Sequence, residues 1–139
     1  MAKSPTQTLS GGRRDRNVDQ IIADLRFEGK GDVVSIFVPS HDKTGKRLDG
    51  RANWAEQAMQ LFGELYGGAT AFNTHCGIYV ADDGRQHWDE PVIVEAFAKR
   101  EHIEDEDRLK RLLEFAKRLK KQTQQVCVMI VFNDVARFI

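Results

Sequence analysis

The chain has 139 residues, with 21 Lys and Arg against 21 Asp and Glu, and 41% of its residues are hydrophobic. A chain of this length buries enough apolar surface to form one core without disulfides or metal ions. The zero formal net charge excludes a globally basic nucleic-acid-binding protein. No apolar run approaches the roughly 20 residues of a membrane span, and the start lacks an apolar leader. We therefore expect a cytoplasmic protein, with Cys76 and Cys127 as buried thiols.

The first 17 residues differ in composition from the rest of the chain. They are rich in Ser, Thr, Gln and Gly and nearly devoid of large apolar side chains. Such a segment buries too little surface to offset the entropy of ordering it, so residues 1–17 are expected to form a flexible arm. Its basic residues are Arg13, Arg14 and Arg16. A single domain over 18–139 is expected to follow, opening with a short helix over 18–27.

A strand and a helix are predicted next. Residues 32–38 are apolar on both faces of an extended chain, which is typical of a buried strand. After a polar loop, Asn53 with Glu56 three residues later has the spacing of a capping box. An apolar stripe at helical spacing follows, and Gly67 and Gly68 end the predicted helix.

The second half of the chain predicts a hairpin, a helix and a strand. Two extended runs, 69–81 and 86–99, flank the turn signal Asp83-Gly84. A helix of about 104–123 and a strand over 126–132 follow, with a short C-terminal extension. The order strand, helix, hairpin, helix, strand predicts an α+β fold, the ferredoxin-like β-α-β-β-α-β plait. Its antiparallel sheet would carry both helices on one face.

The chain lacks the sequence motifs that identify common catalytic and phosphate-binding sites. It has no glycine-rich phosphate loop, no Gly-x-Gly-x-x-Gly and no nucleophile elbow. Its four histidines never recur at metal-ligand spacing, so neither a metal site nor a cofactor is predicted. The plait carries many unrelated functions and specifies none of them.

The sheet face opposite the helices, here named the open face, is unusually apolar. In a plait it is expected to present either Phe37, Ile93, Phe97, Met129 and Val131 or the residues that alternate with them on the same strands. An exposed apolar sheet of that size is uncommon on a monomer, so a second copy is expected to cover it. The prediction is a homodimer or another homo-oligomer.

Polar residues on this face depend on the hairpin register. A two-residue turn pairs Phe72 with Glu95, whereas one extra residue at a bulge near Pro91 pairs Asn73 with Glu95. In the bulged register the open face gathers a candidate ligand-binding set: Ser35, Asn73, His75, Tyr79 and Glu95. A histidine beside a carboxylate is suited to acid–base work, and the alternative is a polar network within an interface.

Two further features have alternative interpretations. The run 87–91, His-Trp-Asp-Glu-Pro, either covers the end of the core with Trp88 or contacts a ligand or partner. The basic end of the second predicted helix either follows the helix dipole or binds phosphates together with the arm. The candidate nucleic-acid residues are Arg13, Arg14, Arg16, Lys117, Arg118 and Lys121.

Three functions remain as hypotheses. The first is a small cytosolic binding or regulatory module that acts as a homo-oligomer through the open face. The second is a small enzyme with a pocket at the sheet interface, using His75, Glu95 and Tyr79. The third is a nucleic-acid-associated protein, for which only weak binding is expected because the chain is neutral overall.

Overall fold

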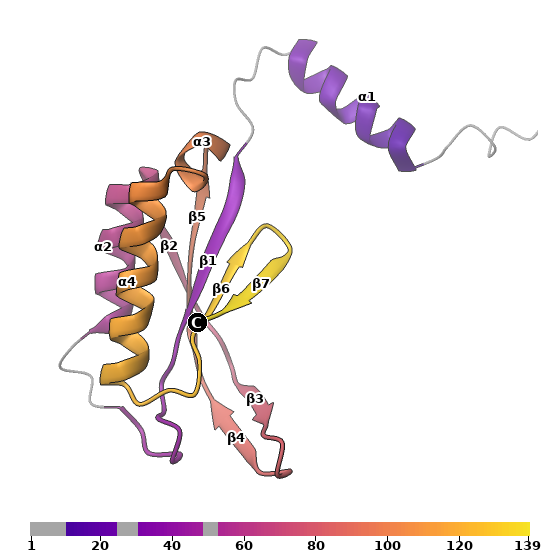
Figure 1. Ribbon diagram of the computed structural model, residues 1–139. Helices are drawn as coiled ribbons and strands as arrows, with labels where there is room; N and C mark the ends of the chain where they lie inside the picture. The colour runs from indigo at the N-terminus through magenta and orange to yellow at the C-terminus, as the bar shows by residue number, and fades with distance from the viewer. Residues whose placement is uncertain (1–10, 25–30, 49–52) are drawn as a thin grey trace, which may run out of the picture. The chain divides into compact units, whose positions relative to one another are not determined.

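This computed structural model describes residues 11–24, 31–48 and 53–139, and for residues 11–17 only the backbone. The chain divides into two compact units, Met1–Lys30 and Gly31–Ile139. The first contains α1 (Gly11–Asp24). The second contains, in order, β1 (Asp32–Val38), α2 (Trp54–Tyr66), β2 (Thr70–Asn73), β3 (Gly77–Val80), β4 (Gln86–Asp89), β5 (Val92–Ala98), α3 (Arg100–Ile103), α4 (Glu106–Gln122), β6 (Met129–Phe132) and β7 (Val135–Phe138) (Figure 1). None of the described helices has the length and apolarity needed to cross a membrane.

Helix α1 corrects the predicted N-terminal boundary. It begins at Gly11 and not at Val18, so residues 11–17 of the predicted flexible arm are helical. The two glycines stand at the start of the helix, and the Arg and Asp residues after them are acceptable in a helix interior. The end of the predicted helix, 25–27, lies outside the described residues.

The second unit is built on a five-stranded sheet in the order β2-β5-β1-β6-β7. Every neighbouring pair is antiparallel, so the predicted α+β fold with an antiparallel sheet is confirmed. Helices α2 and α4 cover one face of the sheet (Figure 1). The order β2-β5-β1-β6 is consistent with the predicted plait, and β7 is the C-terminal extension at its edge.

The core lies between the sheet and these two helices. Alternate positions of β1 and β5 point into it, because successive side chains of a strand face opposite sides. Its largest fully buried apolar side chains are Val34, Ile36, Phe62, Leu65, Val94, Leu112, Leu119, Val128 and Ile130. Trp54 and Phe115 join the two helices in an edge-to-face ring contact with centroids 6.0 Å apart.

The helix ends follow the local signals of the sequence. The Asn53 side chain accepts a hydrogen bond from Glu56 N at 3.2 Å, as expected of an N-cap. Gly67 ends α2 with φ 89°, a left-handed conformation that favours glycine. The predicted helix over 104–123 is shorter at its start, because Asp105 caps α4 by accepting from Arg108 N at 3.0 Å.

The predicted hairpin is divided into two parts. Strand β2 pairs with β5 in the main sheet, whereas β3 and β4 form a separate two-stranded ribbon beyond it (Figure 1). At the division, the three residues 74–76 stand against Glu90 and Pro91. The sequence predicted the extra residue at Pro91, but the structure has it on the opposite strand, among residues 74–76. Thr74 donates its hydroxyl to the Pro91 carbonyl at 2.6 Å across this break.

Both predicted registers were consequently wrong. The ribbon turn has three residues, since Ala81 N donates to Arg85 O at 2.9 Å and Gly84 has φ 83°. With the second shift at the break, Thr70 lies opposite Glu95, and Asn73 lies opposite Val92.

The open face has the apolar composition that the sequence predicted. Cross-strand partners share a face, and its members alternate with buried positions such as Val34 and Val94. They are Val33, Phe37, Phe72, Ile93, Phe97, Met129, Val131 and Phe138. Phe97 is 71% exposed and Phe138 67% exposed, so this face carries large uncovered rings.

Candidate ligand-binding cleft

A cleft lies between the loop after β1 and the β3–β4 ribbon. It consists of two adjoining cavities, one of about 640 Å³ and one of about 420 Å³. They share His41, Lys43, His87, Trp88 and Asp89. We name the larger cavity the polar lobe and the smaller one the apolar lobe. Both volumes are in the range of small-molecule sites.

The apolar lobe is continuous with the open face. Phe37, Met129 and Phe138 belong to both. The ribbon adds Ile78 and Tyr79, and Trp88 stands at the junction with the polar lobe. Tyr79 and Trp88 are 51% and 57% exposed, so their rings are accessible to a ligand. Such a surface is suited to a flat aromatic group.

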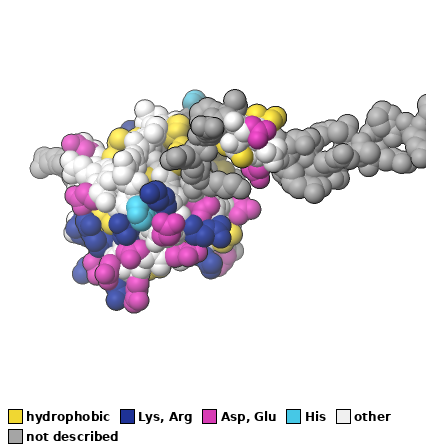
Figure 2. All heavy atoms as spheres, turned by 90° about the horizontal axis from the view of Figure 1, so that it is seen from above, with side chains coloured by type: hydrophobic (Ala, Val, Ile, Leu, Met, Phe, Trp, Pro, Cys, Tyr) yellow, Lys and Arg dark blue, Asp and Glu magenta, His cyan; other side chains and the backbone are white. Residues whose placement is uncertain are grey.

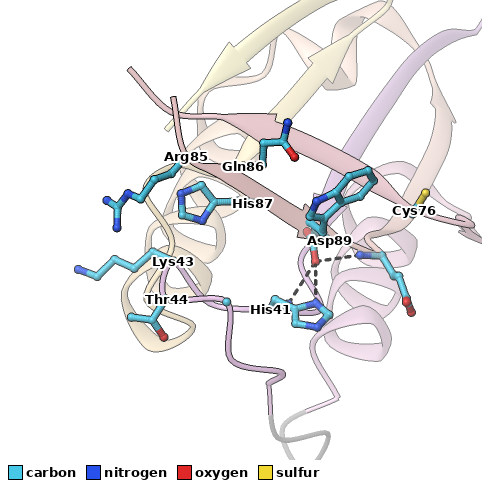
Figure 3. A pocket seen from close by; sticks show the side chains of 11 residues that line it. His41, Lys43, Thr44, Cys76, Arg85, Gln86, His87 and Asp89 are labelled. Atoms are coloured by element: carbon cyan, nitrogen blue, oxygen red, sulfur yellow. Dashed lines mark hydrogen bonds and ion pairs between the residues drawn. The ribbon is translucent and has the colours of Figure 1, made fainter. Parts of the chain in front are cut away.

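The polar lobe has charged walls of both signs. In Figure 3, Lys43 and Arg85 lie on one side, with Cys76 and Asp89 on the other. Arg85 Nε lies 2.6 Å from Asp83 Oδ2, and Glu90 pairs with Arg47 at 3.6 Å. The Lys43 ammonium forms no ion pair within the described part of the chain.

Asp89, the last residue of β4, ties the loop after β1 to the ribbon. Its Oδ1 accepts from the Ser40 backbone N–H at 2.8 Å and from the His41 backbone N–H at 3.1 Å, and Figure 3 shows Asp89 beside His41. The Ser40 hydroxyl donates to the same oxygen at 2.5 Å, and Glu90 N donates to it at 3.0 Å. One carboxylate thus holds two segments that are 49 residues apart.

The same hydrogen bonds determine the tautomer of His41. The Ser40 hydroxyl has one proton, which it donates to Asp89. Its oxygen therefore accepts from Glu90 N at 2.9 Å and from His41 Nδ1 at 2.7 Å. Nδ1 is then the donor of this pair and carries a proton. His41 lines both lobes, so an imidazole of defined tautomer stands at their junction.

The loop that carries His41 and Lys43 is held from two further directions. Asp42 accepts from the Thr44 hydroxyl at 2.6 Å and from Lys46 N at 3.0 Å, and the Thr44 bond is the main cause that lowers the pKa of Asp42 below its usual value. Behind the loop, Lys43 N donates to Gln124 O at 2.9 Å. The cleft wall is therefore built before any ligand arrives.

The structure brings together only part of the predicted ligand-binding set. Ser35 lies opposite Glu95 and donates its hydroxyl to the carboxylate at 3.3 Å. Asn73 lies opposite Val92 on the helix side, because the register differs from both predictions. His75 is exposed in the break between β2 and β3. Tyr79 lines the apolar lobe. Ligand binding by these residues stays a prediction.

Sequence reasoning identified one wall of the cleft and missed the other. A ligand contact is one of the two roles predicted for the run 87–91, and four of its residues line the polar lobe: His87, Trp88, Asp89 and Glu90. The alternative, in which Trp88 covers the core, is wrong because Trp88 is 57% exposed. The residues missed on the loop are Ser40, His41 and Lys43. Their only local signal is a polar run directly after a strand.

The structure also corrects the prediction that both cysteines are buried. Cys76 was predicted to be buried, but it lies exposed in the break and lines the polar lobe. Cys127 is half-buried and lines the apolar lobe. Within the described ranges, no group of three or more His, Cys, Asp and Glu side chains is placed to hold a metal ion.

Three of the candidate nucleic-acid residues, Lys117, Arg118 and Lys121, belong to α4 and line neither lobe of the cleft. Arg118 stacks over the rings of Trp54 and Phe115, at 5.8 and 5.4 Å from their centroids, while Lys117 and Lys121 are exposed. Arg13, Arg14 and Arg16 lie in α1, where only the backbone is described. On the face seen in Figure 2, acidic and basic side chains are interspersed. Helix α4 has Glu106 and Asp107 in its first turn and Lys120 and Lys121 in its last, which favours the helix-dipole interpretation, and nucleic-acid binding stays untested.

Comparisons with known proteins yield a fold and no family. No family model matches the chain, and no curated protein matches it. Among solved structures, it is similar to a phage SAM lyase in complex with S-methyl-5′-thioadenosine, with a TM-score of 0.58, 16% identity, and coverage of 82% of this chain and 92% of that one. The apo state of a phage SAM lyase gives a TM-score of 0.53 with 18% identity, covering 81% and 88% of the two chains. At these identities the likeness shows a shared α+β fold, compatible with a small binding or enzyme module.

Proposed function

We propose that this protein binds an adenosyl sulfur compound in the cleft and cleaves S-adenosylmethionine (SAM) as a lyase. The observation that carries the proposal is the likeness to the phage SAM lyase complex, which extends over 82% of this chain. The chemistry of the apolar lobe supports it independently, because this lobe offers open aromatic rings and has the volume of a small-molecule site.

The ligand class matches the apolar lobe in two respects. Adenine is a flat base that stacks on aromatic side chains, and Tyr79 and Trp88 present such rings. The sulfonium of SAM is a cation, and ring faces attract cations over a few ångströms. The same rings thus serve the base or the sulfonium.

An apolar site also favours the bond cleavage itself. As the bond between the sulfonium and the four-carbon chain breaks, the substrate's own carboxylate forms a bond to that carbon and closes homoserine lactone, while sulfur takes the electron pair and leaves as a neutral thioether. The positive charge on sulfur disappears during the step. Weakly screened surroundings disfavour the charged ground state relative to the less charged transition state. No acid or base needs to act on sulfur.

The test is direct. Purified protein is incubated with SAM, and S-methyl-5′-thioadenosine is quantified by liquid chromatography and mass spectrometry against a boiled sample, which corrects for spontaneous decay. We expect product formation proportional to protein concentration, reduced by Trp88→Ala. Binding of S-methyl-5′-thioadenosine without turnover would support the binding or regulatory module instead. No turnover and no binding would refute the proposal.

We also propose that the open face is covered by a second copy and that the protein is cytoplasmic. Eight large or medium apolar side chains on that face support an oligomer. Since the apolar lobe shares Phe37, Met129 and Phe138 with the open face, an approaching copy would narrow the entrance of the cleft.

A further inference from the structure

The two lobes of the cleft differ in chemistry but are joined. The five residues they share form a common border, so a ligand seated in one lobe reaches the other without crossing the protein. An elongated molecule with an aromatic end and a charged end fits this arrangement. On the proposed function, the nucleoside occupies the apolar lobe, and the polar lobe remains for the rest of the ligand.

The charges of the polar lobe indicate which chemical groups of the ligand it can bind. Lys43 and Arg85 lie on one side of the lobe (Figure 3). Lys43 has no ionic partner among the residues described, and only the Nε of Arg85 is engaged by Asp83. Ammonium and guanidinium groups with free N–H donors are suited to a carboxylate. This side of the lobe therefore has unused capacity for a negative group.

The opposite charge is present in the same lobe. Glu90 lines it, with half of its side chain exposed, and its pair with Arg47 is long at 3.6 Å. Asp89 is saturated by its four donors and is committed to the loop. Glu90 is thus the carboxylate available to an ammonium group.

We infer that the polar lobe binds the zwitterionic amino-acid end of the ligand, its carboxylate at Lys43 and Arg85 and its ammonium at Glu90. This inference rests on the proposed function, because it requires the nucleoside in the apolar lobe. A phosphate would meet Glu90 without compensation, and a purely cationic tail would meet Lys43. A zwitterion satisfies both walls.

Two natural probes separate the lobes. S-methyl-5′-thioadenosine has the nucleoside and no amino acid, whereas S-adenosylhomocysteine has both and is not a sulfonium. Their affinities are measured by isothermal titration calorimetry on the full chain, for the wild type, Lys43→Gln, Glu90→Gln and the control Lys110→Gln. Lys110 lies on α4 and pairs with Glu106 at 3.2 Å, away from the cleft. Circular dichroism checks that each variant is folded.

The expected result is a selective loss. Wild type binds S-adenosylhomocysteine more tightly, and Lys43→Gln and Glu90→Gln each weaken that binding about tenfold, the effect of one charge-assisted hydrogen bond. The affinity of Glu90→Gln for S-methyl-5′-thioadenosine stays within about twofold of wild type, because Glu90 lines only the polar lobe, as do both affinities of Lys110→Gln. Equal losses for both probes, or no preference for the amino-acid compound, would overturn the zwitterion assignment while leaving the nucleoside site intact. Binding of neither probe to wild type would overturn the proposed function together with this inference.

Discussion

Replacing Asp89 with Ala removes the acceptor that joins the loop after β1 to the β3–β4 ribbon. Four donors converge on Oδ1, at 2.5 to 3.1 Å, and three of them belong to the loop. A hydrogen bond to a charged group contributes about 1.5–3 kcal/mol. The Asp89 side chain is 31% exposed, so water replaces part of what is lost. We therefore expect a net loss of about 2–3 kcal/mol in the free energy of unfolding.

Asp89→Asn is the matched variant, because its amide oxygen still accepts but carries no charge. We expect it to lose about 1 kcal/mol. Urea unfolding followed by circular dichroism, with all proteins at one concentration, measures both free-energy losses. In a separate thermal melt, the Ala variant should unfold about 5–15 °C below wild type. The reasoning is refuted if Asp89→Ala stays within about 0.5 kcal/mol of wild type, or if the Asn variant is equally damaged.

Three other outcomes are expected. The Tyr66 hydroxyl is buried without a partner among the described residues, so Tyr66→Phe should stabilise the protein by about 1 kcal/mol in urea unfolding at pH 8. Burial raises the pKa of Tyr66 to about 12, above its unfolded value. The free energy of unfolding of the wild type should therefore fall by about 2–3 kcal/mol relative to Tyr66→Phe as pH rises from 10 to 12. The same pH dependence of stability in both proteins would contradict the raised pKa of Tyr66. Phe97→Lys should convert an oligomer to a monomer in light scattering with unchanged helix content, whereas a monomeric wild type at tens of micromolar would exclude the oligomer. Duplex DNA should bind no tighter than roughly 10⁻⁶ M in fluorescence anisotropy at physiological salt, and nanomolar affinity would reverse the preference against nucleic acid.

Elements with local signals were predictable from the sequence. Strand β1 has the predicted bounds, Asp32–Val38, because its apolar run is delimited on both sides. Helix α2 starts after Asn53 and ends at Gly67, and both residues act through bonds within one or two turns. The open face followed from strand alternation alone, which needs no knowledge of the register with neighbouring strands.

The hairpin register was not predictable from the same cues. It depends on a three-residue turn and on which strand takes the extra residue at the break, and both are decided by packing between distant segments. Pro91 indicated the position of the irregularity but not the strand that bulges. The cleft was missed for a related reason, since Ser40 and Asp89 meet only through the tertiary fold.

The unequal break between the β2–β5 pair and the β3–β4 ribbon makes the ribbon sensitive to a change of a single residue. Three residues stand against two at this point, and side chains of a strand alternate with a period of two. Deleting Cys76 would equalise the count and remove the bulge, while Tyr79–His87 and Ile78–Trp88 could keep their pairing. A one-residue change of length here would therefore alter how the ribbon meets the loop that carries His41 and Lys43, and so the shape of the cleft, without touching the core.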